Sequence, residues 1–341
     1  MKTAVAILNW NTKEYLEKFL PALVKSCEGL DAGVVVADSA STDGSLQFVR
    51  DNFPDIQCIP LDRNYGFTGG YNRALAQVEA EYFVLINSDI EVSHDWLSPL
   101  VEWMDSHPEC GACGPLLHSY QQKDMFEYAG AAGGYLDRFG YPYCRGRVLK
   151  RVEKDEGQYS APKDVMWVSG ACLMTRSRLW KEYGGLDERF FAHMEEIDYC
   201  WRLQLAGYSV TALPHGGVFH LGGGTLPQDS PWKLQLNYRN NLLLLDNNLA
   251  QTIGSFRAWC RITFRQCLDE ASALVYLLKG KREYVKAVRN AHKEYRALKH
   301  RHQKAVSRRM VKGLHNICIL PLAFIKGGNI FKYIRNYENS H

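Results

Sequence analysis

Residues 81–89, EYFVLINSD, decide the fold, because a continuous apolar run ends there in a small polar triplet. Residues 82–86 are too few for the core of a helix and too uniformly apolar for a half-exposed strand, so they predict a central parallel strand. Asn87, Ser88 and Asp89 then lie at its carboxyl end. Ligands bind at that edge of open α/β sheets, where a carboxylate can hold a divalent cation. The alternative is that Asp89 caps a following helix or starts a turn.

Two earlier apolar runs have the same plan, residues 4–8 before Asn9 and residues 34–37 before Asp38. Helix-like stretches at 12–27 and 45–52 separate the runs. This alternation predicts right-handed crossovers in a doubly wound α/β sheet. Asp38, at the strand end itself, is placed to accept hydrogen bonds from a base or a ribose.

The segment after the first predicted strand excludes several common nucleotide-binding classes. Residues 9–12, NWNT, contain no glycine, whereas a nicotinamide dehydrogenase needs a glycine-rich turn there. No GxxxxGK[ST] sequence follows any predicted strand, so a P-loop is also absent. A sugar-nucleotide pyrophosphorylase would carry a glycine-rich basic loop near the first strand, and this chain has none. A nucleotide must therefore be held differently.

Six motifs, in their order along the chain, resemble the inverting family 2 glycosyltransferases. They are ILNWN, VVVADSASTDGS, NYGFTGGYNRAL (64–75), FVLINSD, WVSGACLMTR (167–176) and GGLDERFFAHMEEIDYCWRLQLAGY (184–208). The similarity covers residues 1–245 and is closest to the rhamnosyltransferase-like and galactofuranosyltransferase-like branch that builds bacterial surface polysaccharides. It implies a GT-A fold, in which helices flank a mostly parallel sheet, and a nucleotide-diphosphate sugar donor, dTDP-rhamnose or a UDP-sugar. It also implies a divalent cation, Mg or Mn, and single displacement with inversion.

The resemblance implies a metal site at Asp89 and His220. A cation held by Asp89 offsets the charge on the departing diphosphate without any proton transfer. In the family, a histidine at the position of His220 completes the site, and an imidazole beside a carboxylate suits a cation bound mainly by phosphate oxygens. Taken alone, His220 is an ordinary strand-end histidine. The glycines at 222–224 predict a loop that closes over the donor.

The reaction also needs a base that takes the proton of the acceptor hydroxyl. Glu196 is the predicted base, because the family motif has an acidic pair followed by a third acid, here Glu195, Glu196 and Asp198. The family most often has Asp at the position of Glu196, so this side chain reaches further. For Asp198 the alternative is an ion pair with Arg202, and Glu195 could equally interact with the helix macrodipole.

Two further segments complete the predicted site. Residues 64–75 precede a predicted short helix and offer close backbone approach and polar donors, with a tight turn and packing glycines as the alternative. Residues 167–175 resemble the acceptor-side strand of the family. The predicted nucleotide-sugar contacts are Asn9, Asp38, Asn64, Gly70, Asn72, Arg73, Asn87 and Ser88. The predicted acceptor and sugar pocket consists of Trp167, Ser169, Gly170, Glu195 and Asp198.

The end of the chain differs in charge from the rest. Residues 251–341 hold 19 of the 41 Lys and Arg residues but 5 of the 37 Asp and Glu residues, so the net charge of +4 conceals an acidic first part. The 341 residues suffice for one core of the GT-A size and an appendage. We therefore predict a catalytic domain at 1–245 and a basic helical region at 246–341, with helices near 255–278, 281–302 and 317–325.

The basic region has no apolar run of the length that spans a bilayer. A basic amphipathic region lying on an anionic membrane surface would bring the site near a lipid-linked acceptor. The alternative is a helical subdomain that packs on the catalytic core or on another protomer of a homo-oligomer. Nucleic acid is a weaker option, because no recognised binding module accompanies the charge.

The ten cysteines are scattered, and their one close pair, Cys110 and Cys113, makes a poor zinc site. With no signal peptide they predict free thiols in a reducing compartment, hence a cytoplasmic protein, peripheral on the inner face of the cell membrane if the basic region binds there. The predicted function is sugar transfer to a hydroxyl of a glycan or lipid-linked acceptor in cell-surface polysaccharide synthesis. The alternative is a catalytically silent, sugar-nucleotide-binding or membrane-scaffolding relative that has lost its base.

Overall fold

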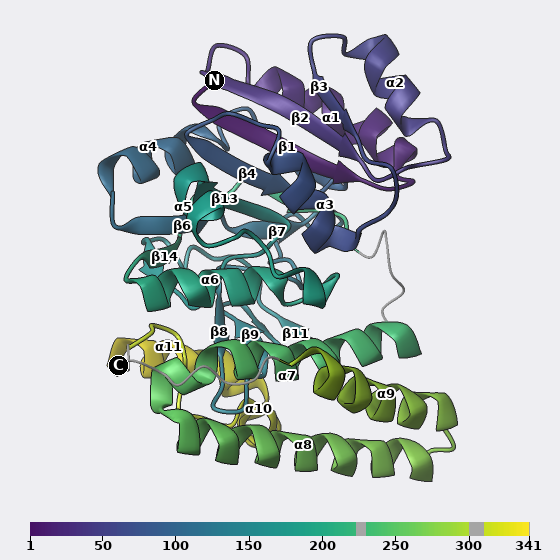
Figure 1. Ribbon diagram of the computed structural model, residues 1–341. Helices are drawn as coiled ribbons and strands as arrows, with labels where there is room; N and C mark the ends of the chain where they lie inside the picture. The colour runs from purple at the N-terminus through teal and green to yellow at the C-terminus, as the bar shows by residue number, and fades with distance from the viewer. Residues whose placement is uncertain (223–229, 300–309, 341) are drawn as a thin grey trace.

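The computed structural model describes residues 1–222, 230–299 and 310–340 and shows an α/β body above a layer of helices (Figure 1). The body is built on an eight-stranded sheet in the order β12-β14-β6-β13-β4-β1-β2-β3. One half of this sheet is entirely parallel, as the alternation of strands and helices predicts. It consists of β1 (Thr3–Asn9), β2 (Ala32–Asp38), β3 (Gln57–Pro60) and β4 (Tyr82–Ile86).

The other half of the sheet is mixed. Its strands are β6 (Cys110–Gly114), β12 (Lys163–Asp164), β13 (Cys172–Arg176) and β14 (Ser209–Ala212). Strand β13 runs antiparallel between β4 and β6, β14 pairs parallel with β6, and β12 closes the edge in the antiparallel sense. The whole sheet is therefore mostly parallel, with β4 near its centre and every residue of β4 buried.

Helices cover both faces of the sheet, which explains why its central strands are continuously apolar. Val5 and Ile7 of β1 belong to the core on one face, while Ala4 and Ala6 belong to the core on the other. The first face is covered by α1 (Lys13–Ser26), α2 (Ser45–Asn52) and α4 (Ser98–Ser106). The second is covered by α3 (Gly66–Leu75), α5 (Ser177–Glu182) and α6 (Glu195–Ala206), with η1 (Glu188–Phe190) leading into α6.

Two small sheets extend the body. The first is ordered β5-β15-β7 and contains β5 (Ile90–Val92), β7 (Leu117–Ser119) and β15 (Val218–His220). Asp89 leads directly into β5, so the alternative that it caps a helix is wrong. The second is antiparallel and contains β8 (Gly134–Leu136), β9 (Pro142–Cys144), β10 (Arg147–Val148) and β11 (Arg151–Val152).

The last part of the chain is helical, as predicted. It comprises α7 (Pro231–Ile253), α8 (Ser255–Leu278), α9 (Arg282–Leu298), α10 (Ile319–Lys326), η2 (Gly327–Asn329) and α11 (Ile330–Ser340). The predicted domain boundary, between residues 245 and 246, lies inside the continuous helix α7. The end of the helix predicted at 281–302, and most of the glycine loop predicted at 222–224, lie outside the described residues.

Much of this helical region packs on the body. Leu242–Leu245 of α7 are buried in the core that also contains α3 and α6 side chains. Arg335 of α11 donates from Nη1 to Glu153 Oε1 at 2.6 Å, and the backbone N–H of Ile319 donates to Asp137 Oδ2 at 3.0 Å. Among the described residues, no helix is long and apolar enough to cross a bilayer. All ten cysteines are free thiols, as predicted.

Candidate active site

The three predicted strand ends meet at one edge of the sheet. Asn9 Nδ2 donates to Asp38 Oδ1 and to Ser45 Oγ, each at 2.7 Å, because the parallel register of β1 and β2 sets residues 9 and 38 side by side. Thr12 Oγ1 lies 2.9 Å from Ser88 Oγ and joins the first strand end to the third. Asp38 Oδ2 also accepts from the backbone N–H of Ser41 at 2.9 Å. The polar residues at these strand ends thus form a closed network of internal hydrogen bonds. We call them the donor side, because they are the residues predicted to contact the nucleotide-sugar donor.

A buried histidine between two carboxylates lies beside this network. His220 Nε2 is 3.2 Å from Asp89 Oδ1, and His220 Nδ1 is 3.3 Å from Glu127 Oε1. Antiparallel pairing of β5 with β15 aligns Ile90 with His220 and so brings the two ends together. Asn87 Nδ2 lies 3.5 Å from the same Nε2.

These side chains fit a divalent cation. Burial lowers the pKa of His220, but its hydrogen bonds with Asp89 and Glu127 outweigh burial and raise that pKa to about 10. Burial raises the pKa of Asp89, but the contact with His220 outweighs burial and leaves that pKa below its ordinary value. Glu127 contacts one ring nitrogen, so the other is turned towards Asp89, and a contact of this kind orients a histidine that binds a metal.

Protein groups alone do not complete a coordination shell here. Within the described ranges, no three His, Cys, Asp or Glu side chains form a metal site. Asp89 and His220 offer two ligands. Oxygen ligands from a phosphate and from water would have to fill the remaining positions, as is usual for Mg and Mn in nucleotide sites.

Glu196 lies in the first turn of α6, after a loop with an unusual backbone. Phe191, His193 and Met194 have φ values of 64°, 73° and 70°. Non-glycine residues rarely adopt this left-handed region, and three within four positions mark a strained segment. Burial raises the pKa of Glu196 to about 7, and its Oε2 atom is buried without a hydrogen-bond partner.

The strained loop is held from α7. The side-chain amide of Asn240 donates to the carbonyl oxygens of Phe190, Ala192 and His193 at 3.0, 2.7 and 2.8 Å. Arg239 Nη2 donates to the same Phe190 carbonyl at 2.8 Å. Asn240 is fully buried. A helix distant in the sequence therefore fixes the backbone from which Glu196 projects.

A short turn at residues 169–171 lies between the end of β4 and Glu196. The backbone N–H of Asn87 donates to the carbonyl of Ala171 at 3.0 Å. A Cβ atom added to the neighbouring Gly170 would lie 3.5 Å from Cβ of Glu196, an ordinary van der Waals contact. Ser169 Oγ donates to the Ala129 carbonyl at 3.1 Å and fixes the turn. The Asp89 segment and Glu196 thus lie on either side of residues 170–171.

The strand ends and the Gly170 turn lie within a segment that matches a known family. Residues 4–184 match the sequence model of Glycosyl transferase family 2. The chain belongs to this family. The matched segment is more than half of the chain and contains both the Asp89 strand end and the Gly170 turn.

Among family 2 relatives, the chain is 26% identical over 309 residues to N-acetylglucosaminyl-diphospho-decaprenol L-rhamnosyltransferase of Mycobacterium tuberculosis, covering 84% of this chain and 98% of the relative. The solved mannosyltransferase PcManGT from Pyrobaculum calidifontis, in complex with GDP-Man and Mn2+, superposes with a TM-score of 0.52 at 14% identity, covering 87% and 86% of the two chains. S. aureus TarS 1-349 in complex with UDP gives 0.51 at 16% identity, covering 92% and 100%. These structures confirm the predicted GT-A fold.

Several residues predicted to bind the nucleotide-sugar have internal partners in this family 2 chain. The sequence predicts a loop ahead of a helix at residues 64–75, but α3 already begins at Gly66. A Cβ atom on Gly70 would lie 2.6 Å from Leu8, so this glycine allows α3 to pack on β1. The other three are engaged as follows: Asn64 with the backbone N–H of Gly66, Asn72 with both backbone groups of Leu186, and Arg73 with Glu188 at 2.8 Å.

Two residues predicted for the acceptor pocket belong to the interior. Asp198 accepts from Arg202 Nε at 2.7 Å and from the side-chain amides of Asn247 and Asn248, so the ion-pair alternative is what the structure shows. Trp167 is buried against Gly134 and donates to the Tyr135 carbonyl. Glu195 is buried, with its Oε2 unpartnered, and burial and the charge of Glu196 raise its pKa. It remains next to the predicted base.

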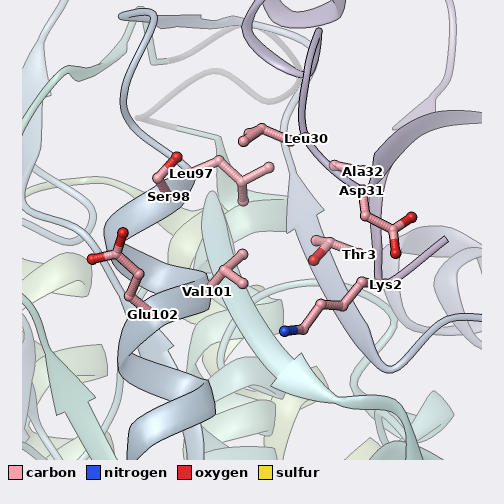
Figure 2. Close-up of a pocket in the computed structure, with 9 residues that line it drawn as sticks. All are labelled: Lys2, Thr3, Leu30, Asp31, Ala32, Leu97, Ser98, Val101 and Glu102. Atoms are coloured by element: carbon pink, nitrogen blue, oxygen red, sulfur yellow. The ribbon is translucent and has the colours of Figure 1, made fainter.

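A cavity of about 180 Å³ lies at the opposite end of the strands (Figure 2). Lys2, Thr3 and Asp31 line it from the amino ends of β1 and β2, and Ser98 and Glu102 of α4 face them. Ligand pockets usually have at least about 300 Å³. Its size and its place at the wrong end of the strands exclude it as the donor site of a family 2 enzyme.

The sequence did not single out Glu127 or Asn240, although both shape the site. Glu127 comes from a loop, and no strand end or motif marks it. Asn240 lies in α7, in the run NYRNNLLLLDNN, where a buried polar stripe on an apolar helix was the available signal. Both act through long-range contacts that a local pattern does not reveal.

Proposed function

We propose that this chain is a metal-dependent inverting glycosyltransferase that transfers a sugar from a nucleotide diphosphate to a hydroxyl of a lipid-linked glycan. The observation that carries the proposal is Glu196. A carboxylate whose pKa is about 7, with one oxygen unpartnered, is suited to take a proton at neutral pH. It lies across the Gly170 turn from the strand end that carries Asp89.

In the proposed reaction, the acceptor hydroxyl approaches the anomeric carbon while Glu196 takes its proton. Displacement from the side opposite the leaving diphosphate inverts the configuration at that carbon. Burial and the charge of Glu196 raise the pKa of Glu195, so the two carboxylates repel each other and uptake of a proton relieves this repulsion. The strained loop and Asn240 keep the carboxylate at a fixed position, which aligns it with the acceptor.

Asp89 and His220 would hold the divalent cation, and Glu127 would orient the His220 ring. When bound, such a cation stabilises the negative charge on the leaving diphosphate. The proposal draws support from PcManGT, a structural neighbour in complex with Mn2+.

The donor proposed is dTDP-rhamnose, with a UDP-sugar as the next choice, and the acceptor is a lipid-linked glycan of the cell surface. The support is the relationship over almost the full length to an L-rhamnosyltransferase whose name specifies a diphospho-decaprenol acceptor. The polar edge formed by Asn9, Asp38, Ser88 and their neighbours would contact the nucleotide.

The test is a donor screen followed by a transfer assay. Thermal-shift measurements with dTDP-, UDP- and GDP-sugars, each with Mn, with Mg and with EDTA, identify the donor. Transfer to a synthetic polyprenyl-diphospho-sugar is then followed by mass spectrometry, and NMR of the product gives the anomeric configuration. Donor binding without turnover of any acceptor would favour the catalytically silent alternative, and a retained configuration would exclude the single displacement.

A further inference from the structure

The helix α8 has an apolar face that the described residues leave uncovered. Its buried side, Ala258, Ile262, Arg265, Asp269 and Ala273, repeats every three or four residues and faces the other helices. On the opposite side, large apolar side chains are exposed: Phe256 by 76%, Phe264 by 50%, Leu274 by 56% and Leu278 by 79%. We call these four residues the α8 face. In Figure 1, α8 forms the lower rim of the molecule, beyond α7 and away from β1–β4.

The α8 face carries no negative charge. Of the two acids of α8, Asp269 is buried 2.9 Å from Arg265, and the half-exposed Glu270 lies at the side of the helix, 3.3 Å from His292. The smaller outward residues are Cys, Thr and Ala. An exposed apolar stripe of this length, about 36 Å for the helix, marks an interaction surface and not an ordinary solvated helix.

Three arginines without acid partners border this face. Arg257 and Arg261 are one turn apart on α8, and Arg138 lies at the tip of the β8–β9 hairpin. That tip touches α8, because the rings of Phe139 and Phe264 have centroids 4.9 Å apart. Arg265 and Arg335 nearby have acid partners, whereas none of these three forms an ion pair within the part of the chain that the structure describes.

Arg138 and Arg257 lie close enough to Arg261 to affect it. Burial, followed by the like charges of Arg138 and Arg257, lowers the pKa of Arg261, and the charge of Asp137 opposes this shift. Arg138 Nε is buried without a hydrogen-bond partner. Asp137, the acid of the same hairpin, already accepts from the backbone N–H groups of Phe139, Tyr141 and Ile319. An external anion is therefore the missing partner.

We propose that α8 lies in the interface of an anionic phospholipid bilayer, with the α8 face among the acyl chains and the three arginines on lipid phosphates. Guanidinium groups bind phosphate oxygens in pairs, and an apolar helix face bordered by cations is typical of interfacial helices. A symmetric contact between two copies of α8 would set the arginines against an apolar face, because none of the four residues of the α8 face is acidic. The inference is independent of the proposed transfer chemistry.

A second helix bound to the same hairpin also exposes apolar side chains. The backbone N–H of Ile319, at the start of α10, is bound to Asp137 of the hairpin that touches α8. Phe324 and Ile325 of α10 are exposed by 80% and 76%. The hairpin tip thus joins two helices that both expose large apolar side chains.

The test uses the full chain and vesicle flotation. Vesicles of phosphatidylcholine alone are compared with vesicles in which roughly a third of the lipid is phosphatidylglycerol. The protein should float with the anionic vesicles, and about 0.5 M NaCl should weaken this binding because it screens the arginines. Equal recovery with both vesicle types would overturn the proposal.

Variants separate the apolar and the charged contributions. Phe256→Ser with Leu274→Ser and Leu278→Ser should reduce vesicle affinity by roughly 100-fold, and Arg257→Ala with Arg261→Ala by roughly tenfold. The matched controls are Leu30→Ser, which changes an exposed leucine next to β2, and Lys25→Ala with Arg50→Ala, which removes two exposed cations from α1 and α2. Thermal melts verify that each variant is folded.

Two further readouts separate the alternatives. All variants should keep the donor affinity and the turnover of a detergent-solubilised acceptor, so a chain that floats but transfers nothing would refute the proposed function and leave this inference intact. Light scattering reports the oligomeric state. A dimer in solution that the α8 variant dissociates would assign the face to a second copy and overturn the membrane proposal.

Discussion

The donor side and the base side of the site are built in opposite ways. On the donor side, Asn9, Asp38 and Ser45 satisfy one another at the ends of adjacent parallel strands. On the base side, Glu195 and Glu196 each keep a buried oxygen without a partner, after a loop of left-handed residues. Groups that only position a ligand can form hydrogen bonds with other protein groups in the free protein. An oxygen without a hydrogen-bond partner leaves the proposed base, Glu196, free to accept a proton from a hydroxyl.

The largest effect should follow from Glu196→Gln, which keeps the size of the side chain and removes its basicity. We expect kcat to fall by roughly 10²- to 10⁴-fold, while the donor Kd, measured by calorimetry, stays unchanged because the donor side is untouched. The control is Glu188→Gln, an exposed residue paired with Arg73. A loss of donor affinity as large as the loss of kcat would contradict the division into two sides.

The second largest effect should follow from a change at Glu127, whose carboxylate contacts Nδ1 of His220. Glu127→Gln should reduce Mn affinity by roughly 10- to 100-fold, as measured by electron paramagnetic resonance of free Mn in the absence of acceptor. Saturating Mn should then restore most of kcat. Glu91→Gln in β5, whose side chain pairs with Lys123, is the matched control. Unchanged Mn affinity in the Glu127 variant would remove this residue from the metal site.

Asn240→Ala tests whether α7 holds the base-side loop. The carbonyl groups of Ala192 and His193 lose this donor, while that of Phe190 keeps Arg239. The free energy of unfolding should fall by about 1–3 kcal/mol, and kcat should fall more than donor affinity. Asn237→Ala on the same helix is the control, since the Asn237 side chain forms no hydrogen bond with the described residues. An equal change in both variants would show that the loop does not depend on Asn240.

The pH dependence should also separate the two sides. The pKa of Glu196 is about 7, against an ordinary value of 4.5, and the base must be ionised. We expect kcat/KM to rise with pH up to about 7 and then level off, while donor affinity follows no such step. A profile that is flat between pH 5.5 and 8 would exclude Glu196 as the titrating base.

The same raised pKa predicts a change in stability. Since the unfolded chain ionises Glu196 more readily, the folded state loses stability as pH rises from 4.5 to 7, by on the order of 3 kcal/mol. Glu196→Gln removes this loss. The variant should therefore be more stable than the natural chain at pH 8 and equally stable at pH 4.5, as measured by chemical denaturation at both values.

The smallest effect should come from Gly170→Ala. Its Cβ would make ordinary contacts with Glu196 and Phe67, so we expect a change in stability within about 0.5 kcal/mol and little loss of kcat. Gly70→Ala, on the donor side, would bring a methyl group to 2.6 Å from Leu8 and should lower stability by about 1–3 kcal/mol. A larger loss of stability in Gly170→Ala than in Gly70→Ala would show that the turn next to Glu196 is packed more tightly than the contact of α3 with β1.

Local pattern predicted most of the fold. The apolar run at 82–86 is β4 residue for residue, and the helix predicted at 255–278 is α8. Gly207 ends α6 in a left-handed conformation, which glycine adopts readily after a helix. These features depend on neighbours within a few positions, so the sequence states them directly. Within the motif at 64–75, Gly70 allows α3 to pack on β1, a contact that only the tertiary structure reveals.

In the candidate site, too, some features follow from local sequence and others from tertiary contacts. The amino-acid sequence by itself determined which polar residues stand at the strand ends, because the strand period is local, and its family motif marked Glu196. Only the tertiary structure placed Glu127 behind His220, turned Asp198 towards α7 and clamped the loop before Glu196 with Asn240. The physical reason is that burial and unsatisfied charge, which tune a carboxylate, arise from groups that are distant in sequence and close in space.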